Sequence, residues 1–204
     1  MAKLKLSYFD IPASRGEECR LALFVAGVDF EDHRVKRGDW AVLKPVTPFG
    51  CLPVLEQEGK PAVSQSNAIL GYIGRQYGLL PSDTWEALRL ESLLCAAEDL
   101  RAAVSKTFGI RDPEELERRR AELVDGPIRI WAANMEKQIK GPFAGGAEIS
   151  VADLKVFIVA GWLKKGVLDH VPTDVLSPFS MLEGLYKNVK KHPKVVEWYA
   201  RAHS

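Results

Sequence analysis

The sequence lacks the features that mark a membrane or nucleic-acid-binding protein. Its 204 residues contain no apolar run near the roughly 20 residues that a membrane span requires. Lys and Arg (28) nearly balance Asp and Glu (27), which leaves a net charge of +1. Neither net charge nor a basic block therefore provides a general attraction to nucleic acid or to an anionic membrane.

Cysteine and histidine are also scarce. Cys19, Cys51 and Cys95 are far apart and form no CxxC motif, which argues against a disulfide scaffold and a zinc site. The four histidines lack the spacing of metal ligands. The first residues, MAKLKLSYF, contain no long apolar stretch typical of a secretory signal. We therefore expect a cytoplasmic protein without a metal.

The first part of the chain alternates strand and helix signals. Residues 3–9 alternate apolar and polar side chains, as in a half-buried strand. A helix follows, in which Ser14 and Glu17 fit a capping box and Gly27 is a natural stop. Residues 28–35 predict a second strand, so the three elements form a βαβ unit with parallel strands.

A hairpin and a helix complete this part. Residues 52–57 and 60–65 flank a turn at Glu58-Gly59 and predict two antiparallel strands. Residues 66–78 return to the helical period. The composition changes near residue 81, after which strand signals almost vanish. The sequence therefore predicts two domains, a mixed sheet with helices over residues 1–80 and an all-helical domain over residues 81–204.

Helix signals in the second domain are local and specific. A long helix is predicted over residues 84–108, and Asp112 with Pro113 provides an N-cap and an N1 proline for another. That helix is predicted to be interrupted at Gly126-Pro127. Ser150 and Asp153 occupy N-cap and N3 of a further helix.

Three residues of the first domain stand where chemistry can occur. Tyr8 ends the first strand, Pro53 opens the third, and Ser66 begins a helix whose N–H groups suit a carboxylate. Each also has a purely structural interpretation: a half-buried core residue, an ordinary strand-start proline, and an N-cap worth about 1 kcal/mol.

These residues belong to a series of short motifs with specific spacing. The series is Tyr8-Phe9, SRG at 14–16, Trp40, Lys44-Pro45, Phe49-Gly50, Leu52-Pro53-Val54, Gln65-Ser66 and SVAD at 150–153. It resembles the glutathione S-transferases, most closely the sigma class, over nearly the whole chain. The resemblance implies an α/β thioredoxin-like N-terminal domain plus an all-α C-terminal domain.

The resemblance also implies how glutathione is held. Ser66, with Gln65 beside it, would both cap its helix and bind the γ-glutamyl carboxylate. Trp40 and Lys44 would bind the glycyl carboxylate, as a hydrogen-bond donor and a point charge.

Backbone and subunit contacts are implied as well. A cis Pro53 would turn the Leu52 backbone outward, to pair with the cysteinyl backbone of glutathione. Asp99 would reach the γ-glutamyl ammonium bound in the neighbouring subunit of a homodimer, although an exposed helix charge explains it equally well. Phe49 would insert into a pocket of that subunit.

Thiol activation has two candidate donors. Tyr8 matches the hydroxyl that stabilises the thiolate in the family. Arg15 would steady the site by polar contacts, although a charge on the helix face explains it equally well. The segment DIPAS (10–14) is longer than its counterpart and brings Ser14 to the start of the first helix, where other classes use a serine. The sequence leaves open whether Tyr8 or Ser14 activates the thiol.

The second substrate would be a small apolar electrophile. Phe9, Ile11, Val104 and Phe108 would line its site, although ordinary packing between domains explains them nearly as well. We expect a glutathione transferase with glutathione as co-substrate and no further cofactor. The alternatives are a glutathione-dependent isomerase or peroxidase of the same fold, or a non-enzymatic ligand-binding or structural relative.

Overall fold

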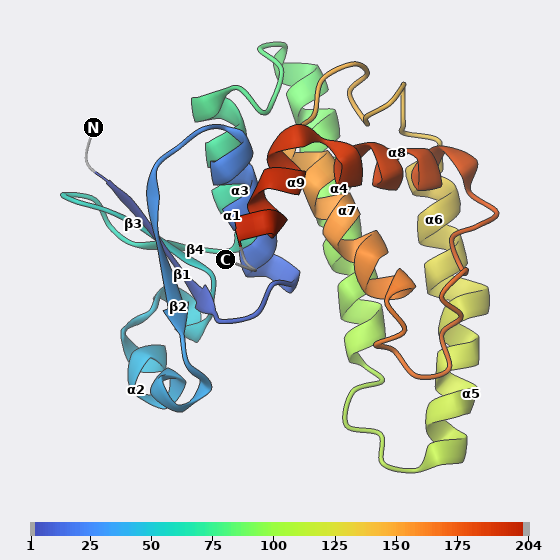
Figure 1. Cartoon of the computed structure of the whole chain (residues 1–204). Coiled ribbons are helices and arrows are strands. Elements are labelled where there is room, and N and C mark those ends of the chain that lie inside the picture. The colour runs from blue at the N-terminus through green and yellow to red at the C-terminus, as the bar shows by residue number, and fades with distance from the viewer. Residues whose placement is uncertain (1–2, 202–204) are drawn as a thin grey trace. The chain divides into compact units, whose positions relative to one another are not determined.

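The computed structural model describes residues 3–201, which form two compact units (Figure 1). The first unit joins residues 3–83 to residues 193–201, and the second unit spans Thr84–His192. The predicted division near residue 81 stays a prediction, and by its contacts the last helix groups with the first unit. The ends of the two expected domains, residues 1–2 and 202–204, lie outside the described part.

The first unit is built on a four-stranded sheet with the order β2-β1-β3-β4. The strands are β1 (Leu4–Phe9), β2 (Phe30–Val35), β3 (Val54–Gln57) and β4 (Val63–Ser64). β1 pairs with β2 in parallel, whereas β3 is antiparallel to both β1 and β4. Helices α1 (Ser14–Val25) and α3 (Ser66–Tyr77) pack against each other. The predicted βαβ unit, hairpin and helix are thereby confirmed.

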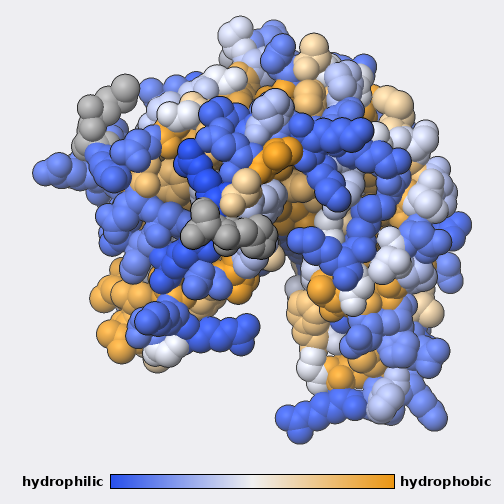
Figure 2. Space-filling view, viewed as in Figure 1, coloured by the Kyte–Doolittle hydropathy of each residue, from blue (hydrophilic) through white to orange (hydrophobic). Residues whose placement is uncertain are grey.

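A chain of short helical turns connects β2 to β3. The turns are η1 (Arg37–Asp39), α2 (Trp40–Leu43), η2 (Lys44–Val46) and η3 (Pro48–Gly50). Figure 2 shows apolar side chains gathered over this segment, where Val42, Val46 and Phe49 are 78%, 77% and 83% exposed. Such a cluster is unusual for a surface that faces only water.

The C-terminal helix α9 (Pro193–Arg201) packs on α1. The Trp198 ring lies 5.2 Å from the Phe24 ring and 6.4 Å from the Phe30 ring, measured between centroids. Its indole Nε1 donates a hydrogen bond of 2.7 Å to Glu17 Oε1. The last helix of the chain thus covers one face of the first helix.

The second unit is helical throughout its regular elements. They are α4 (Thr84–Ser105), α5 (Pro113–Leu123), a π-helical turn (Val124–Ile128), α6 (Arg129–Glu136), α7 (Val151–Lys164) and α8 (Ser180–Lys191). α7 forms the centre of this unit, because residues 151–161 are all buried and both α4 and α8 pack on it. No helix within residues 3–201 is both long and apolar enough to cross a membrane.

The predicted helix starts of this unit are confirmed. The Ser150 and Asp153 side chains exchange hydrogen bonds with each other's backbone N–H in a capping box, and Asp112 Oδ1 accepts from the Glu114 N–H. The predicted interruption at Gly126-Pro127 is confirmed for the α-helix, which ends at Leu123 and resumes at Arg129. The chain stays helical there through the π-helical turn, which accommodates the proline that an α-helix interior disfavours.

Candidate active site

Tyr8 lies near the end of β1 and is only 6% exposed. Its ring meets the Phe9 ring edge-on at 5.6 Å, and the guanidinium carbon of Arg20 lies 5.8 Å from its centroid. The backbone of Gly16 in α1 lies so close that an added Cβ would be 2.0 Å from Tyr8 Cδ1. Since no real Cβ contact is that short, the first turn of α1 fixes the position of the Tyr8 ring.

Arg20 is fully buried beneath the connection between β1 and α1. Its guanidinium donates to the backbone oxygens of Phe9 (3.1 Å) and Ile11 (3.0 Å) and to Asp32 Oδ1 (2.7 Å). It also lies 3.4 Å from Glu17 Oε2. The sequence analysis did not single out Arg20. Its i,i+3 spacing from Glu17 is the signal that could have indicated a buried polar network.

The predicted capping box of Ser14 and Glu17 is wrong. Ala13 is the N-cap of α1 and no side-chain cap bond forms there. Glu17 instead turns inward to Arg20 and Trp198. Burial raises the pKa of the Glu17 carboxyl, against the lowering effect of those two partners. Ser14 has a left-handed backbone (φ 63°), and the neighbouring Arg15 is half-buried.

Four further predicted residues lie between β2 and β3. The half-buried ring of Trp40 meets the Phe9 ring edge-on at 5.6 Å. The Lys44 side chain runs beside Gly50, where an added Cβ would lie 3.6 Å from Lys44 Cε. The Leu52–Pro53 peptide bond is cis, as the resemblance implied.

The start of α3 is tied to the same segment. Ser64 Oγ donates to the backbone oxygen of Pro48 at 2.9 Å, and Gln65 Nε2 lies 3.9 Å from Cys51 Sγ. Gln65 (φ 79°) is the N-cap residue of α3 and forms no side-chain cap bond, while the buried Ser66 is the first helical residue. The N-cap is therefore Gln65 and not the expected Ser66, which stands in the N-terminal turn.

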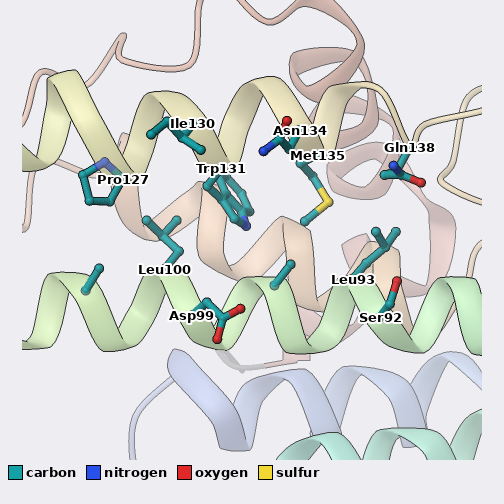
Figure 3. Close-up of a pocket in the computed structure, with 12 residues that line it drawn as sticks. Ser92, Leu93, Asp99, Leu100, Pro127, Ile130, Trp131, Asn134, Met135 and Gln138 are labelled. Atoms are coloured by element: carbon teal, nitrogen blue, oxygen red, sulfur yellow. The ribbon is translucent and has the colours of Figure 1, made fainter.

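The remaining predicted residues belong to the second unit. Asp99 is exposed on α4 and lines a pocket of about 420 Å³ between α4 and α6 (Figure 3). Leu93, Leu100, Trp131 and Met135 form much of the pocket wall. Val104 is buried, whereas Phe108 is 55% exposed.

The structure thus brings the predicted residues together in groups. Tyr8, Phe9 and Trp40 form a row of ring contacts, and Ser64 joins the N-terminal turn of α3 to the segment before Pro53. Ile11 is half-buried and its backbone oxygen is held by Arg20. A hydroxyl near the end of a strand beside a helix N-terminus can stabilise one anion with the hydroxyl and another with backbone N–H groups.

Known proteins are similar to this chain in both sequence and architecture. Residues 4–75 match the family model "Glutathione S-transferase, N-terminal domain", and residues 98–202 match the C-terminal domain model of the same family. Glutathione S-transferase 1 of Ascaris suum is 32% identical, over 98% of this chain and 97% of the relative.

Two solved structures extend the comparison. Prostaglandin synthase D of Nilaparvata lugens superimposes with a TM-score of 0.85 at 28% identity, covering 98% of both chains. The glutathione S-transferase from Ascaris lumbricoides gives a TM-score of 0.79 at 32% identity, covering 98% of this chain and 97% of the other. With both domain models matched in order along a thioredoxin-like and a helical unit, this chain belongs to the glutathione S-transferase family.

Proposed function

We propose that this glutathione S-transferase uses the Tyr8 hydroxyl to hold glutathione as its thiolate, and that the thiolate attacks a small apolar electrophile. The observation that carries the proposal is the placement of Tyr8, fixed by Gly16 on one side and near the buried Arg20. A free thiol has a pKa of about 8.5, so little of it is ionised near neutral pH. A hydrogen bond to a charged group is worth roughly 1.5–3 kcal/mol, which lowers a pKa by about one to two units.

Glutathione binds along the first unit in this proposal. The N-terminal turn of α3, with Ser66 and Gln65, receives the γ-glutamyl carboxylate. Trp40 and Lys44 receive the glycyl carboxylate. The hydrogen bond from Ser64 to Pro48, which ties these two regions together, supports a single extended ligand. Preorganised donors of this kind lower the ordering cost of binding.

Two smaller roles complete the glutathione site. The Leu52 backbone, next to the cis Pro53, pairs with the cysteinyl backbone of glutathione as an added strand. Arg15, half-buried in the first turn of α1, steadies the site by polar contacts.

The test compares the two hydroxyls that the sequence left open. Tyr8→Phe should raise the pKa of the bound thiol by about one to two units and lower turnover near neutral pH. Ser14→Ala should leave both unchanged, because Tyr8 and not Ser14 donates to the thiolate in this proposal. The measurement is the thiolate absorbance of bound glutathione against pH. A shift with Ser14→Ala but not with Tyr8→Phe would make Ser14 the donor.

The residues proposed for the electrophile are Phe9, Ile11, Val104 and Phe108, as the resemblance implies. A second candidate activity is a glutathione-dependent isomerisation, favoured by the likeness to prostaglandin synthase D of Nilaparvata lugens. The two activities differ in stoichiometry. Conjugation consumes one glutathione per product, whereas isomerisation regenerates it, so titrating free thiol during turnover separates them.

The proposed enzyme is a homodimer. Phe49 is 83% exposed with a left-handed backbone (φ 58°), which presents its ring outward. The pocket between α4 and α6 has room for such a ring, and the buried Trp131 Nε1 in its wall has no hydrogen-bond partner among residues 3–201. Phe49 of one copy fills this pocket of the other and brings Asp99 to the neighbouring glutathione site. A buried aromatic anchor is a typical interface hot spot.

A further inference from the structure

Arg120, in the last turn of α5, is a buried cation without a carboxylate partner. Its side chain is 5% exposed, and neither Nε nor Nη1 has a hydrogen-bond partner within residues 3–201. The other buried cations of the described chain are paired: Arg20 with Asp32 at 2.7 Å, Arg101 with Glu98 at 2.8 Å and Lys155 with Glu98 at 2.6 Å. An unpaired buried charge is costly, so its retention requires an explanation.

The surroundings of Arg120 are aromatic. Its guanidinium carbon lies 5.7 Å from the centroid of the Phe108 ring, and the Phe108 ring lies 6.1 Å from that of Trp162. A cation–π contact uses the face of the ring and leaves the N–H edges of the guanidinium without acceptors. Burial lowers the pKa of Arg120, and the charge of Asp169 opposes this without forming an ion pair.

Phe108 is the exposed neighbour of this cation, with its ring centroid 5.7 Å from the guanidinium carbon. The Phe108 ring is more than half exposed, so it has space to turn aside, whereas the guanidinium beneath it is held on a helix. A ligand with a flat apolar body could then stack on Trp162 and place an acid group against Arg120. A planar carboxylate or sulfonate matches the geometry of guanidinium donors.

We propose that Phe108, Arg120 and Trp162 bind electrophiles that carry an anionic group on a flat apolar body. This inference rests on the proposed function, since it assigns Phe108 to the electrophile site. The protein then favours acidic electrophiles over neutral ones of the same shape. In a nitroaryl chloride of this class, the thiolate forms the C–S bond and chloride leaves with the electron pair of the C–Cl bond.

The test uses the full chain and a matched pair of electrophiles, 4-chloro-3,5-dinitrobenzoate and 4-chloro-3,5-dinitrobenzamide. Each kcat/KM is divided by the uncatalysed rate with glutathione. The acid should be favoured in the wild type, and Arg120→Met should lower kcat/KM for the acid roughly 10- to 100-fold while changing the amide less than about two-fold. Arg120→Lys should retain part of the preference, because it keeps the charge but not the planar donors.

Arg119→Met is the matched control. Arg119 neighbours Arg120 in sequence, but its side chain is 43% exposed and paired with Glu122 at 3.0 Å. This variant should leave the acid-to-amide ratio unchanged. If both arginine variants lost the preference for the acid equally, the preference would come from the general surface charge. That result would overturn the proposal.

A binding measurement separates this inference from the proposed function. With S-methylglutathione in the glutathione site, 3,5-dinitrobenzoate should raise the melting temperature of the wild type but not of Arg120→Met. If this protection occurs without turnover of either electrophile, the anion site stands and the proposed conjugation fails. If the wild type turns over both electrophiles without preferring the acid, conjugation stands and the anion site is wrong, whether or not Arg120→Met folds.

Discussion

Gly16 controls the position of Tyr8 through its size alone. Replacing it with alanine would put a Cβ 2.0 Å from the ring, so either the ring or the first turn of α1 must move. We expect Gly16→Ala to lower kcat at neutral pH by about 100-fold, the typical cost of misplacing a reacting group by 1 Å. The overpacking should also destabilise the fold by roughly 1–3 kcal/mol.

The control for this prediction is Gly38→Ala. An added Cβ at Gly38 meets no atom within 4 Å. This variant should keep both kcat and the melting temperature. Steady-state kinetics and thermal unfolding of the two variants check the prediction, and full activity of Gly16→Ala would show that the position of Tyr8 does not depend on this contact.

The residues of the site could be predicted only in part. The roles of Ser66, Trp40 and Pro53 came from the resemblance to the family, and the structure finds Pro53 cis as that resemblance implied. The N-caps of α1 and α3 are Ala13 and Gln65, one residue before the expected Ser14 and Ser66. In α1 the reason is physical: Glu17 bonds to Trp198, 181 residues away, and no local pattern shows such a partner.

At the scale of the element, Glu86 anchors the first turn of α4. Its carboxylate accepts from Arg89 Nη2 at 2.6 Å and from Lys140 Nζ at 2.8 Å. Arg89 also donates to the backbone oxygens of Gln138 and Ala144 at 2.9 and 2.8 Å. This cluster ties the start of α4 to the connection between α6 and α7.

The pH dependence of this cluster follows from the pKa of Glu86. The hydrogen bond from Arg89, followed by that from Lys140, lowers it from 4.5 to about 2. A lowered carboxyl pKa stabilises the fold above the unfolded-state value and loses that contribution as pH falls through the folded-state value. Glu86→Gln should therefore cost about 1 kcal/mol at pH 6, and the gap to the wild type should shrink between pH 4.5 and 2.

Urea unfolding at several pH values checks this prediction. Glu117→Gln, at an exposed acid of α5, is the control and should track the wild type throughout. A constant gap for Glu86→Gln from pH 6 to pH 2 would mean that the glutamine disturbs packing rather than removing a charge.

Local signals explain which elements the sequence predicted well. The caps at Asp112 and Ser150 depend on side chains within three residues, and both are confirmed. The interruption expected at Gly126-Pro127 depends on how neighbouring turns absorb a proline. A π-helical turn does so here, and its formation depends on packing that the local sequence does not encode.

At the scale of the whole molecule, the proposed dimer gives a direct prediction. Sedimentation at micromolar concentration should find a dimer, and Phe49→Ser should shift it toward monomer by removing the exposed ring that fills the partner pocket. Glutathione affinity should fall with it, since Asp99 is proposed to act across subunits. Val167→Ser, at another exposed apolar residue (60%), should leave the dimer intact. A wild-type monomer would remove the roles proposed for both Phe49 and Asp99.

The division into a mixed and a helical part could be read from the sequence because composition changes sharply near residue 81. That α9 belongs to the first unit could not be read from the sequence. Its contacts with Phe24, Phe30 and Glu17 join residues far apart in sequence, so the periodicity of residues 193–201 predicts a helix but not its partner.

The first unit is made of two stretches that are far apart in the sequence, and this affects how the chain folds during synthesis. The sheet, α1 and α3 leave the ribosome first, but the helix that covers α1 follows only after the roughly 110 residues of Thr84–His192. At the usual 5–20 residues per second, translation of that stretch takes about 5–20 s. During this interval the nascent chain displays Phe24 and Phe30 without their aromatic cover. The first unit therefore completes its folding last, and a chaperone that binds exposed aromatic residues would find its target there in the unfinished chain.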